Sequence, residues 1–256
     1  MNMDAYLQRL NYNGPRTRTL ETLQALHQAH LLAVPFENLD IHLGRAIVLE
    51  EEALYDKIVR QRRGGFCYEL NGLFAALLRE LDFEVNLLSG RVMENGEFGP
   101  EFDHLTLLVP LEERWLADIG FGDSFREPLR LAESKEQIQH GVAYRLNNSG
   151  GQWTMQRRLP NHDWEQQYRF TLQPHRLTDL AGMCRYHQTS PASHFTQQRI
   201  CSRATPEGRV TLSDMRLIIT DNGQRQETVL QNQEEYSHAL QEHFGIDLDI
   251  SKAYRS

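Results

Sequence analysis

Between residues 70 and 81 the apolar side chains recur at the spacing of an α-helix. They fall at i, i+3, i+4, i+7, i+8 and i+11, and they are Leu70, Leu73, Phe74, Leu77, Leu78 and Leu81. A continuous stripe of this kind forms the buried face of a helix, so the rest of the fold must pack around it. The segment Arg63-Gly-Gly-Phe-Cys67 stands directly before the stripe. Cys67 is therefore predicted at the start of a central helix.

Two further helical segments are predicted before it. The first follows Thr19, a residue type that caps helix N-termini, and its spaced positions are Leu20, Leu23, Leu26 and His30. The second is short and amphipathic, with Leu54, Ile58 and Val59 on one side. The histidines of the first segment, His27 and His30, are interpreted as its solvent edge rather than as metal ligands.

From about Glu84 the apolar period changes to two, which is typical of half-buried strands. The strand-like runs span residues 85–92, 104–109, 115–119, 142–146, 153–155 and 168–172. Turn sequences rich in Asn and Gly join them, so a small antiparallel sheet or barrel is predicted. The last third predicts a hairpin of residues 210–220 and 226–230 around Asp221-Asn-Gly, followed by a helix over about 233–244.

Charge and composition exclude several functions. The formal net charge is -8, which provides no basic surface for nucleic acid. The sequence has neither a basic start followed by an apolar stretch nor a run of about 18 apolar residues, so we expect a cytoplasmic protein that does not enter a membrane. The three cysteines, Cys67, Cys184 and Cys201, form no CxxC pair, which argues against disulfides and structural zinc. No bound metal is expected.

Cys67 is the candidate nucleophile. A free thiol has a pKa of about 8.5, and the partial positive charge at a helix N-terminus favours the reactive thiolate. The alternative is that Cys67 is a small apolar residue that heads the stripe, because cysteine is among the most buried residue types. Its neighbourhood alone does not decide between the two.

His104 and Asp118 supply the groups that would activate such a thiol. If the turn after Pro110 centres on Leu111, paired residues have numbers that sum to 222, and these two side chains become direct cross-strand neighbours. A carboxylate bound to one imidazole nitrogen leaves the other free to accept the thiol proton. The alternative is an ordinary pair on the surface of a sheet.

Other residues are assigned softer roles. Glu37 and Arg63 suit a partly buried ion pair. Phe36, Phe121 and Phe125 are candidates to line an apolar pocket for a flat substrate. The tight loop Gly99-Pro-Glu-Phe102 precedes His104 and could present backbone N–H groups to a ligand.

Several segments together resemble the arylamine N-acetyltransferase family. They are Val34-Pro-Phe-Glu-Asn-Leu-Asp40, Arg63-Gly-Gly-Phe-Cys-Tyr-Glu-Leu-Asn71, Asp103-His-Leu105, Asp118-Ile-Gly-Phe-Gly122, Thr189-Ser-Pro-Ala-Ser-His-Phe195 and Thr205-Pro-Glu-Gly208. The resemblance runs over nearly the whole chain. It implies an α+β fold with a cysteine-protease-like core: a helical domain over residues 1–83 with the nucleophile, an antiparallel β-barrel over 84–188 with the His and Asp, and an α/β lid over 189–256.

The same resemblance implies the chemistry. Cys67, His104 and Asp118 match the family's catalytic triad, and a ping-pong transfer would carry an acetyl group from acetyl-CoA through Cys67 to an arylamine, arylhydrazine or N-hydroxyarylamine. Acetyl-CoA is then a cosubstrate, and no permanently bound cofactor is expected. An oxyanion hole is expected from the N–H groups of Cys67 and of a residue near Phe102. The resemblance also places Phe36, Phe121, Asp123 and Phe125 at the acceptor pocket. It places Gly99, Pro100 and Glu101 near the CoA channel.

Two alternatives stay open at the level of the sequence. A papain-like or transglutaminase-like hydrolase uses the same three residue types and passes the acyl group to water. A binding module would retain Cys67 only as a core residue. The physiological acceptor, the balance of N- and O-acetylation, the acyl-chain selectivity and the oligomeric state are not encoded in any pattern of the sequence.

Overall fold

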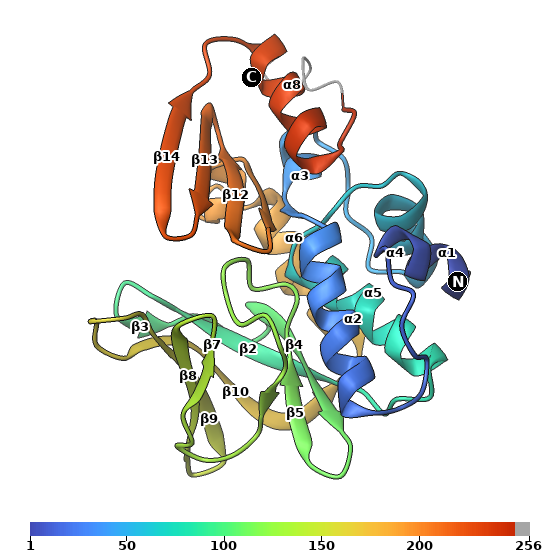
Figure 1. The fold of residues 1–256 in the computed structure, drawn as a ribbon, viewed down its shortest axis with the longest axis vertical. Helices are drawn as coiled ribbons and strands as arrows, with labels where there is room; N and C mark the ends of the chain where they lie inside the picture. The colour runs from blue at the N-terminus through green and yellow to red at the C-terminus, as the bar shows by residue number, and fades with distance from the viewer. Residues whose placement is uncertain (249–256) are drawn as a thin grey trace.

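The computed structural model describes residues 1–248, so the last eight residues of the predicted domain 189–256 lie outside it. Helices gather on one side of the molecule, a curved sheet lies beside them, and a smaller sheet with the last helix covers one end (Figure 1). The helical segments are α1 (Met3–Arg9), α2 (Leu20–Ala33), α3 (Leu39–His42), α4 (Glu51–Tyr55), a π-helical turn (Asp56–Arg60), α5 (Cys67–Glu80), a 3-10 turn (Leu177–Leu180), α6 (Ala181–Thr189), α7 (His194–Gln197) and α8 (Gln233–Phe244).

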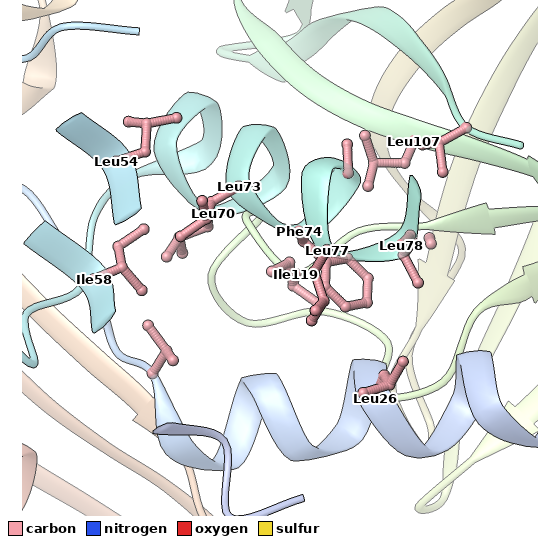
Figure 2. Close-up of a cluster of buried hydrophobic side chains, with 14 of the residues drawn as sticks. Leu26, Leu54, Ile58, Leu70, Leu73, Phe74, Leu77, Leu78, Leu107 and Ile119 are labelled. Atoms are coloured by element: carbon pink, nitrogen blue, oxygen red, sulfur yellow. The ribbon is translucent and has the colours of Figure 1, made fainter. Parts of the chain in front are cut away.

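Helix α5 lies at the centre of the main core, as its apolar stripe predicts. Figure 2 shows Phe74 and Leu77 of this helix on the side that faces Leu26 of α2, with Leu70 toward Ile58 near the start of the helix. Burial of several such side chains, each contributing about 1.5 to 3 kcal/mol, fixes the helix against its neighbours. The N-terminus is held by the Glu69 carboxylate, whose Oε2 accepts from the Phe66 N–H at 3.1 Å. Cys67 is thereby placed as the first residue of the helix.

Helix α2 has the predicted N-cap, because the Thr19 side chain accepts from the Thr22 N–H. The prediction that His27 and His30 form the solvent edge of this helix is wrong, because both side chains are fully buried. Each is accommodated by hydrogen bonds: His30 contacts the Tyr6 hydroxyl at 2.9 Å, and His27 contacts main-chain groups. Both nitrogens of His27 thus have partners, whereas Nδ1 of His30 is buried without one.

The predicted barrel is a nine-stranded antiparallel sheet that nearly closes on itself. Its strands run in the order β6-β5-β4-β2-β10-β9-β8-β7, with β3 paired to β2. Their bounds are β2 (Asn86–Glu94), β3 (Glu97–Phe98), β4 (His104–Pro110), β5 (Arg114–Ala117), β6 (Leu129–Arg130), β7 (Gln137–Gln139), β8 (Val142–Ser149), β9 (Gln152–Arg158) and β10 (Glu165–His175). The Gln137 side chain bridges the two edge strands through the backbone N–H and C=O of Arg130. The prediction of a mixed fold, with helices and a barrel-like sheet, is thus confirmed.

A second antiparallel sheet has the order β1-β11-β12-β13-β14. Its strands are β1 (Phe36–Glu37), β11 (Ile200–Ala204), β12 (Gly208–Ser213), β13 (Arg216–Asp221) and β14 (Gln224–Val229). The prediction of one strand over 210–220 is wrong, because the chain turns back at Asp214, which adopts a φ of 45°. The turn at Asn222-Gly223 is confirmed, with positive φ at both residues. The domain boundaries at 83 and 188 stay predictions; β1 belongs to the sheet formed mainly by the last third of the chain.

No helix within residues 1–248 has both the length and the apolar character required to span a bilayer.

Candidate active site

A cavity of about 900 Å³ opens where the helices, the barrel and the second sheet meet. Cys67 and His104 both line it, and so do Phe36, Phe121 and Asp123. The cavity therefore collects side chains that are widely separated in the sequence around the Cys67 thiol and the His104 imidazole.

Cys67 is the first residue of α5 and is 4% exposed. Burial raises the pKa of its thiol well above the ordinary value, and a hydrogen bond from the Leu105 backbone acts in the opposite direction. The helix N-terminus expected to favour thiolate is present, and desolvation of the buried thiol acts against it. Ionisation of this thiol thus requires a partner that takes the proton.

His104 begins β4, and its Nε2 lies 2.7 Å from Asp118 Oδ2. The predicted register is wrong, because paired residues of β4 and β5 have numbers that sum to 224, as for Leu107 with Ala117. The turn centres on Glu112, one residue later than expected. A shift of two in the sum keeps the side-chain face, so the two groups meet diagonally instead of directly.

Asp118 lies just beyond the end of β5, in a fully hydrogen-bonded setting. Its Oδ1 accepts from the Asn71 amide at 2.9 Å and from the Gly120 N–H at 3.0 Å. Burial alone would raise the pKa of this carboxyl, but His104, Asn71 and the Gly120 N–H together hold it below its usual range. Asp118 is therefore a carboxylate at neutral pH.

Sequence reasoning missed Asn71. Its amide also donates to the Leu105 carbonyl at 2.6 Å, and its oxygen accepts from the Ile119 N–H at 3.0 Å. One side chain thereby joins α5 to β4 and to the segment after β5. Its position four residues after Cys67 on the same helix face was the available signal.

The softer predicted site residues divide into two groups. Phe36, Phe121, Asp123, Gly99 and Pro100 line the cavity. Phe125 and Glu101 are not among the lining residues: the Phe125 ring is buried among barrel side chains, and Glu101 is exposed.

The N–H group of Phe102 itself is not free to contribute to the expected oxyanion hole. The Phe102 N–H already donates to Ser89 Oγ at 2.7 Å, and its carbonyl accepts from the Tyr68 hydroxyl at 2.6 Å. Phe102 also adopts a φ of 65°. These bonds hold the loop before His104 against α5 and leave the N–H of Phe102 committed.

Two further imidazoles line the cavity and were not expected from sequence, those of His187 and His194. His187 of α6 contacts Asp103 Oδ1 at 3.1 Å through Nε2 and Ser193 Oγ at 3.0 Å through Nδ1. Both ring nitrogens are occupied by protein groups. The pair with Asp103 therefore fastens the α6 segment to the end of the barrel loop.

The predicted ion pair of Glu37 and Arg63 is confirmed, with Nη2 and Oε1 2.8 Å apart. It belongs to a larger buried network, because Lys57 Nζ lies 2.8 Å from both Asp40 Oδ2 and Glu69 Oε1. These groups fix the chain before α5, where Gly64 packs against the Pro35 carbonyl so closely that a side chain has no room.

Within residues 1–248, no three His, Cys, Asp or Glu side chains are arranged to hold a metal ion.

Known proteins resemble this chain in sequence and in fold. A family model described as N-acetyltransferase matches residues 19–253. The arylamine N-acetyltransferase / N-hydroxyarylamine O-acetyltransferase of Salmonella typhimurium is 38% identical over 256 residues, which cover 98% of this chain and 90% of the relative. A solved structure of the Salmonella typhimurium arylamine N-acetyltransferase has a TM-score of 0.91 at 36% identity, over 96% of this chain and 92% of that one. The Mycobacterium marinum enzyme in complex with CoA gives 0.91 at 31% identity, over 98% and 97%.

Proposed function

The chain belongs to the arylamine N-acetyltransferase family, and on that premise we propose that it moves an acetyl group from acetyl-CoA to aromatic amines through an acetyl-Cys67 intermediate. The observation that carries the proposal is the Asp118–His104 pair, with 2.7 Å between Oδ2 and Nε2, in the cavity that Cys67 lines. Arylhydrazines and N-hydroxyarylamines are further acceptors, since each has a nucleophilic nitrogen or oxygen with a lone pair, one atom away from the aromatic ring.

In the first half-reaction, the Cys67 sulfur attacks the thioester carbonyl. Because Nε2 of His104 donates to Asp118, Nδ1 is the nitrogen available to take the thiol proton. The new C–S bond forms as the bond to the CoA sulfur breaks, and the proton on His104 passes to the leaving CoA thiolate. The products are acetyl-Cys67 and CoA.

In the second half-reaction, the acceptor nitrogen attacks the acetyl carbon. Its lone pair forms the new C–N bond, the Cys67 sulfur leaves, and the nitrogen proton returns to the thiolate through His104. Cys67 is regenerated as a thiol, so each acetyl transfer closes the cycle without any permanently bound cofactor.

The cavity wall favours a flat aromatic acceptor. Phe36, Phe121 and Phe195 line it, and the Phe121 ring contacts His104 edge-on with centroids 5.1 Å apart. A ring held among these faces excludes water from the acetyl-enzyme, which favours transfer over hydrolysis. We assign Gly99, Pro100 and Glu101 to the CoA side of the same opening, and the second sheet with α8 to a lid over it. We also propose that the protein is cytoplasmic, where acetyl-CoA is available, and that it acts in the metabolism of foreign amines.

The test separates a transferase from a thiol hydrolase. The protein is incubated with acetyl-CoA and its intact mass is measured, with Cys67→Ala as the control. A gain of about 42 Da, absent in the variant and removed on addition of an aromatic amine with formation of the acetylated amine, supports the proposal. Release of acetate without product amide indicates a hydrolase, and the absence of an adduct on wild type contradicts acetyl-Cys67 chemistry.

A further inference from the structure

We infer that His27 is a positioning residue for the reaction: it fastens both ends of the loop 118–126, which carries Asp118 and part of the cavity wall. The inference rests on the proposed function for its kinetic readout, but the contacts that support it do not.

His27 binds the two ends of that loop with its two ring nitrogens. Its Nε2 accepts from the main-chain N–H of Asp118 at 3.1 Å, and its Nδ1 lies 2.8 Å from the main-chain carbonyl of Arg126. A carbonyl only accepts, so Nδ1 carries the proton and Nε2 carries the lone pair. One neutral imidazole therefore fills one donor role and one acceptor role.

The surroundings keep that imidazole neutral. The side chain is fully buried, it stacks on Phe125 with centroids 5.8 Å apart and planes 13° apart, and it meets Phe74 edge-on. Burial lowers the pKa of His27 to about 4, although its bond to the Arg126 carbonyl and the Asp118 charge act in the other direction. The other titratable group close to it on α2, His30, is held neutral in the same way. A cation at this place would lose its acceptor role toward Asp118.

The segment after β5 is thereby immobilised at three consecutive N–H groups. The N–H of Asp118 donates to His27, that of Ile119 to the Asn71 oxygen, and that of Gly120 to Asp118 Oδ1. The last two bonds connect the segment to α5 and to itself. The bond to His27 connects it to α2, and it is the contact that sets the backbone of the residue that orients His104.

The loop between the two contacts contributes directly to the cavity. Phe121, Gly122 and Asp123 line it, all within the span that His27 closes. Loss of the contact frees an N–H at one end and a carbonyl at the other, and the carboxylate of Asp118 then samples positions away from His104. A displacement of about 1 Å in a catalytic group can cost about 100-fold in rate.

Paired substitutions distinguish positioning from packing. His27→Met removes the acceptor, whereas His27→Gln has similar length and places an amide oxygen near the former Nε2. His30→Met is the matched control: it also replaces a fully buried histidine of α2 that packs against Phe74, but its partner is the Tyr6 hydroxyl. For each variant we would measure the Tm, the kcat and KM for acetyl transfer, and the rate of Cys67 alkylation by iodoacetamide, mapped by peptide mass.

The expected result is a fall in kcat and in alkylation rate of about 10- to 100-fold for His27→Met, with KM changed less than about twofold. His27→Gln should recover most of that loss. His30→Met should keep both rates within about threefold of wild type, even if its Tm falls as much as that of His27→Met. If His27→Met does not fold, His27→Asn takes its place, because its amide is too short to reach the Asp118 N–H.

Two outcomes overturn the inference: an acceptor-free variant whose kcat and alkylation rate match those of His30→Met, or a His27→Gln variant as impaired as His27→Met. If wild type shows no acetyl transfer at all, the proposed function fails, while the alkylation rates of the variants still decide the role of His27.

Discussion

The Asn71 amide donates to Oδ1 of Asp118 at 2.9 Å, so one oxygen of that carboxylate is reserved for α5. The Gly120 N–H donates to the same oxygen. The other oxygen, Oδ2, faces His104. The two oxygens thus have different partners, and because a carboxylate oxygen can only accept, Nε2 of His104 carries the proton.

The substitution Asp118→Asn should remove activity through the tautomer of His104. The two donors at the former Oδ1 require the amide oxygen there, so the new NH₂ group points at Nε2 of His104. That nitrogen must then accept, its proton moves to Nδ1, and the imidazole can no longer take the thiol proton. We expect a fall in kcat of about 10³- to 10⁴-fold with little change in Tm, measured by single-turnover acetylation. A loss of less than about tenfold would contradict this account.

Gly120→Ala should displace the nucleophile. A Cβ at this position would lie 2.8 Å from the Cα of Cys67 and 2.7 Å from Nδ2 of Asn71, and the first of these is backbone that cannot rotate away. We expect a loss of about 1 to 3 kcal/mol in the free energy of unfolding and a lower kcat. Gly182→Ala in α6 is the control, because nothing lies within 4 Å of its added methyl. In urea unfolding, the control should have a free energy of unfolding equal to or higher than that of wild type. Equal free energies of unfolding for the two variants would refute the steric argument.

Stability should fall in mild acid because of His27. Its pKa is lowered by burial from 6.5 to about 4 in the folded protein, so the unfolded chain binds the extra proton first. The stabilisation is complete above about pH 6.5 and is lost as the pH falls toward 4. Near pH 5 the loss relative to neutral pH amounts to about 2 kcal/mol. Urea unfolding near pH 7.5 and pH 5 should show a smaller difference for His27→Gln than for wild type; an equal difference would assign the acid sensitivity elsewhere.

Lys57→Met should destabilise the fold strongly. Its ammonium lies 2.8 Å from both Asp40 and Glu69 and 3.9 Å from Glu37, and all three carboxylates are largely buried. Removal of the cation leaves them with too little positive charge, at a cost of about 3 to 5 kcal/mol. Arg60→Met, three residues later, loses two exposed ion pairs and should change the unfolding transition little. Similar transitions for both variants would count against the buried network.

Local periodicity was sufficient to predict the helices and strands that bury one regular face. The apolar stripe of α5 and the bounds of α8 follow directly from sequence. The strand expected over 115–119 ends at Ala117, since the N–H groups of Asp118 and Ile119 bind side chains from α2 and α5 instead of a neighbouring strand. Local sequence does not encode those long-range partners.

The parts of the candidate site that depend only on residue type, and on which face of the sheet a side chain lies, were predictable from sequence. The meeting of His104 with Asp118 survived an error in the turn, because the error was an even number of residues in the pairing sum. The role of His27 was not predictable, since a histidine on an amphipathic helix looks solvent-facing until the partners of both nitrogens are known. The turn between β12 and β13 at Asp214 was not predicted, because no Gly or Pro marks it in the sequence.

The pairing of β1 with β11 places Phe36 opposite Ser202, across more than half of the chain. A ribosome delivers these two strands far apart in time, so the edge of β1 must wait unpaired while the barrel is made. Phe36, Ile200 and Thr211 all line the cavity around Cys67. A nascent chain that has not yet reached residue 211 therefore holds the thiol in a cavity that lacks the wall supplied by the second sheet.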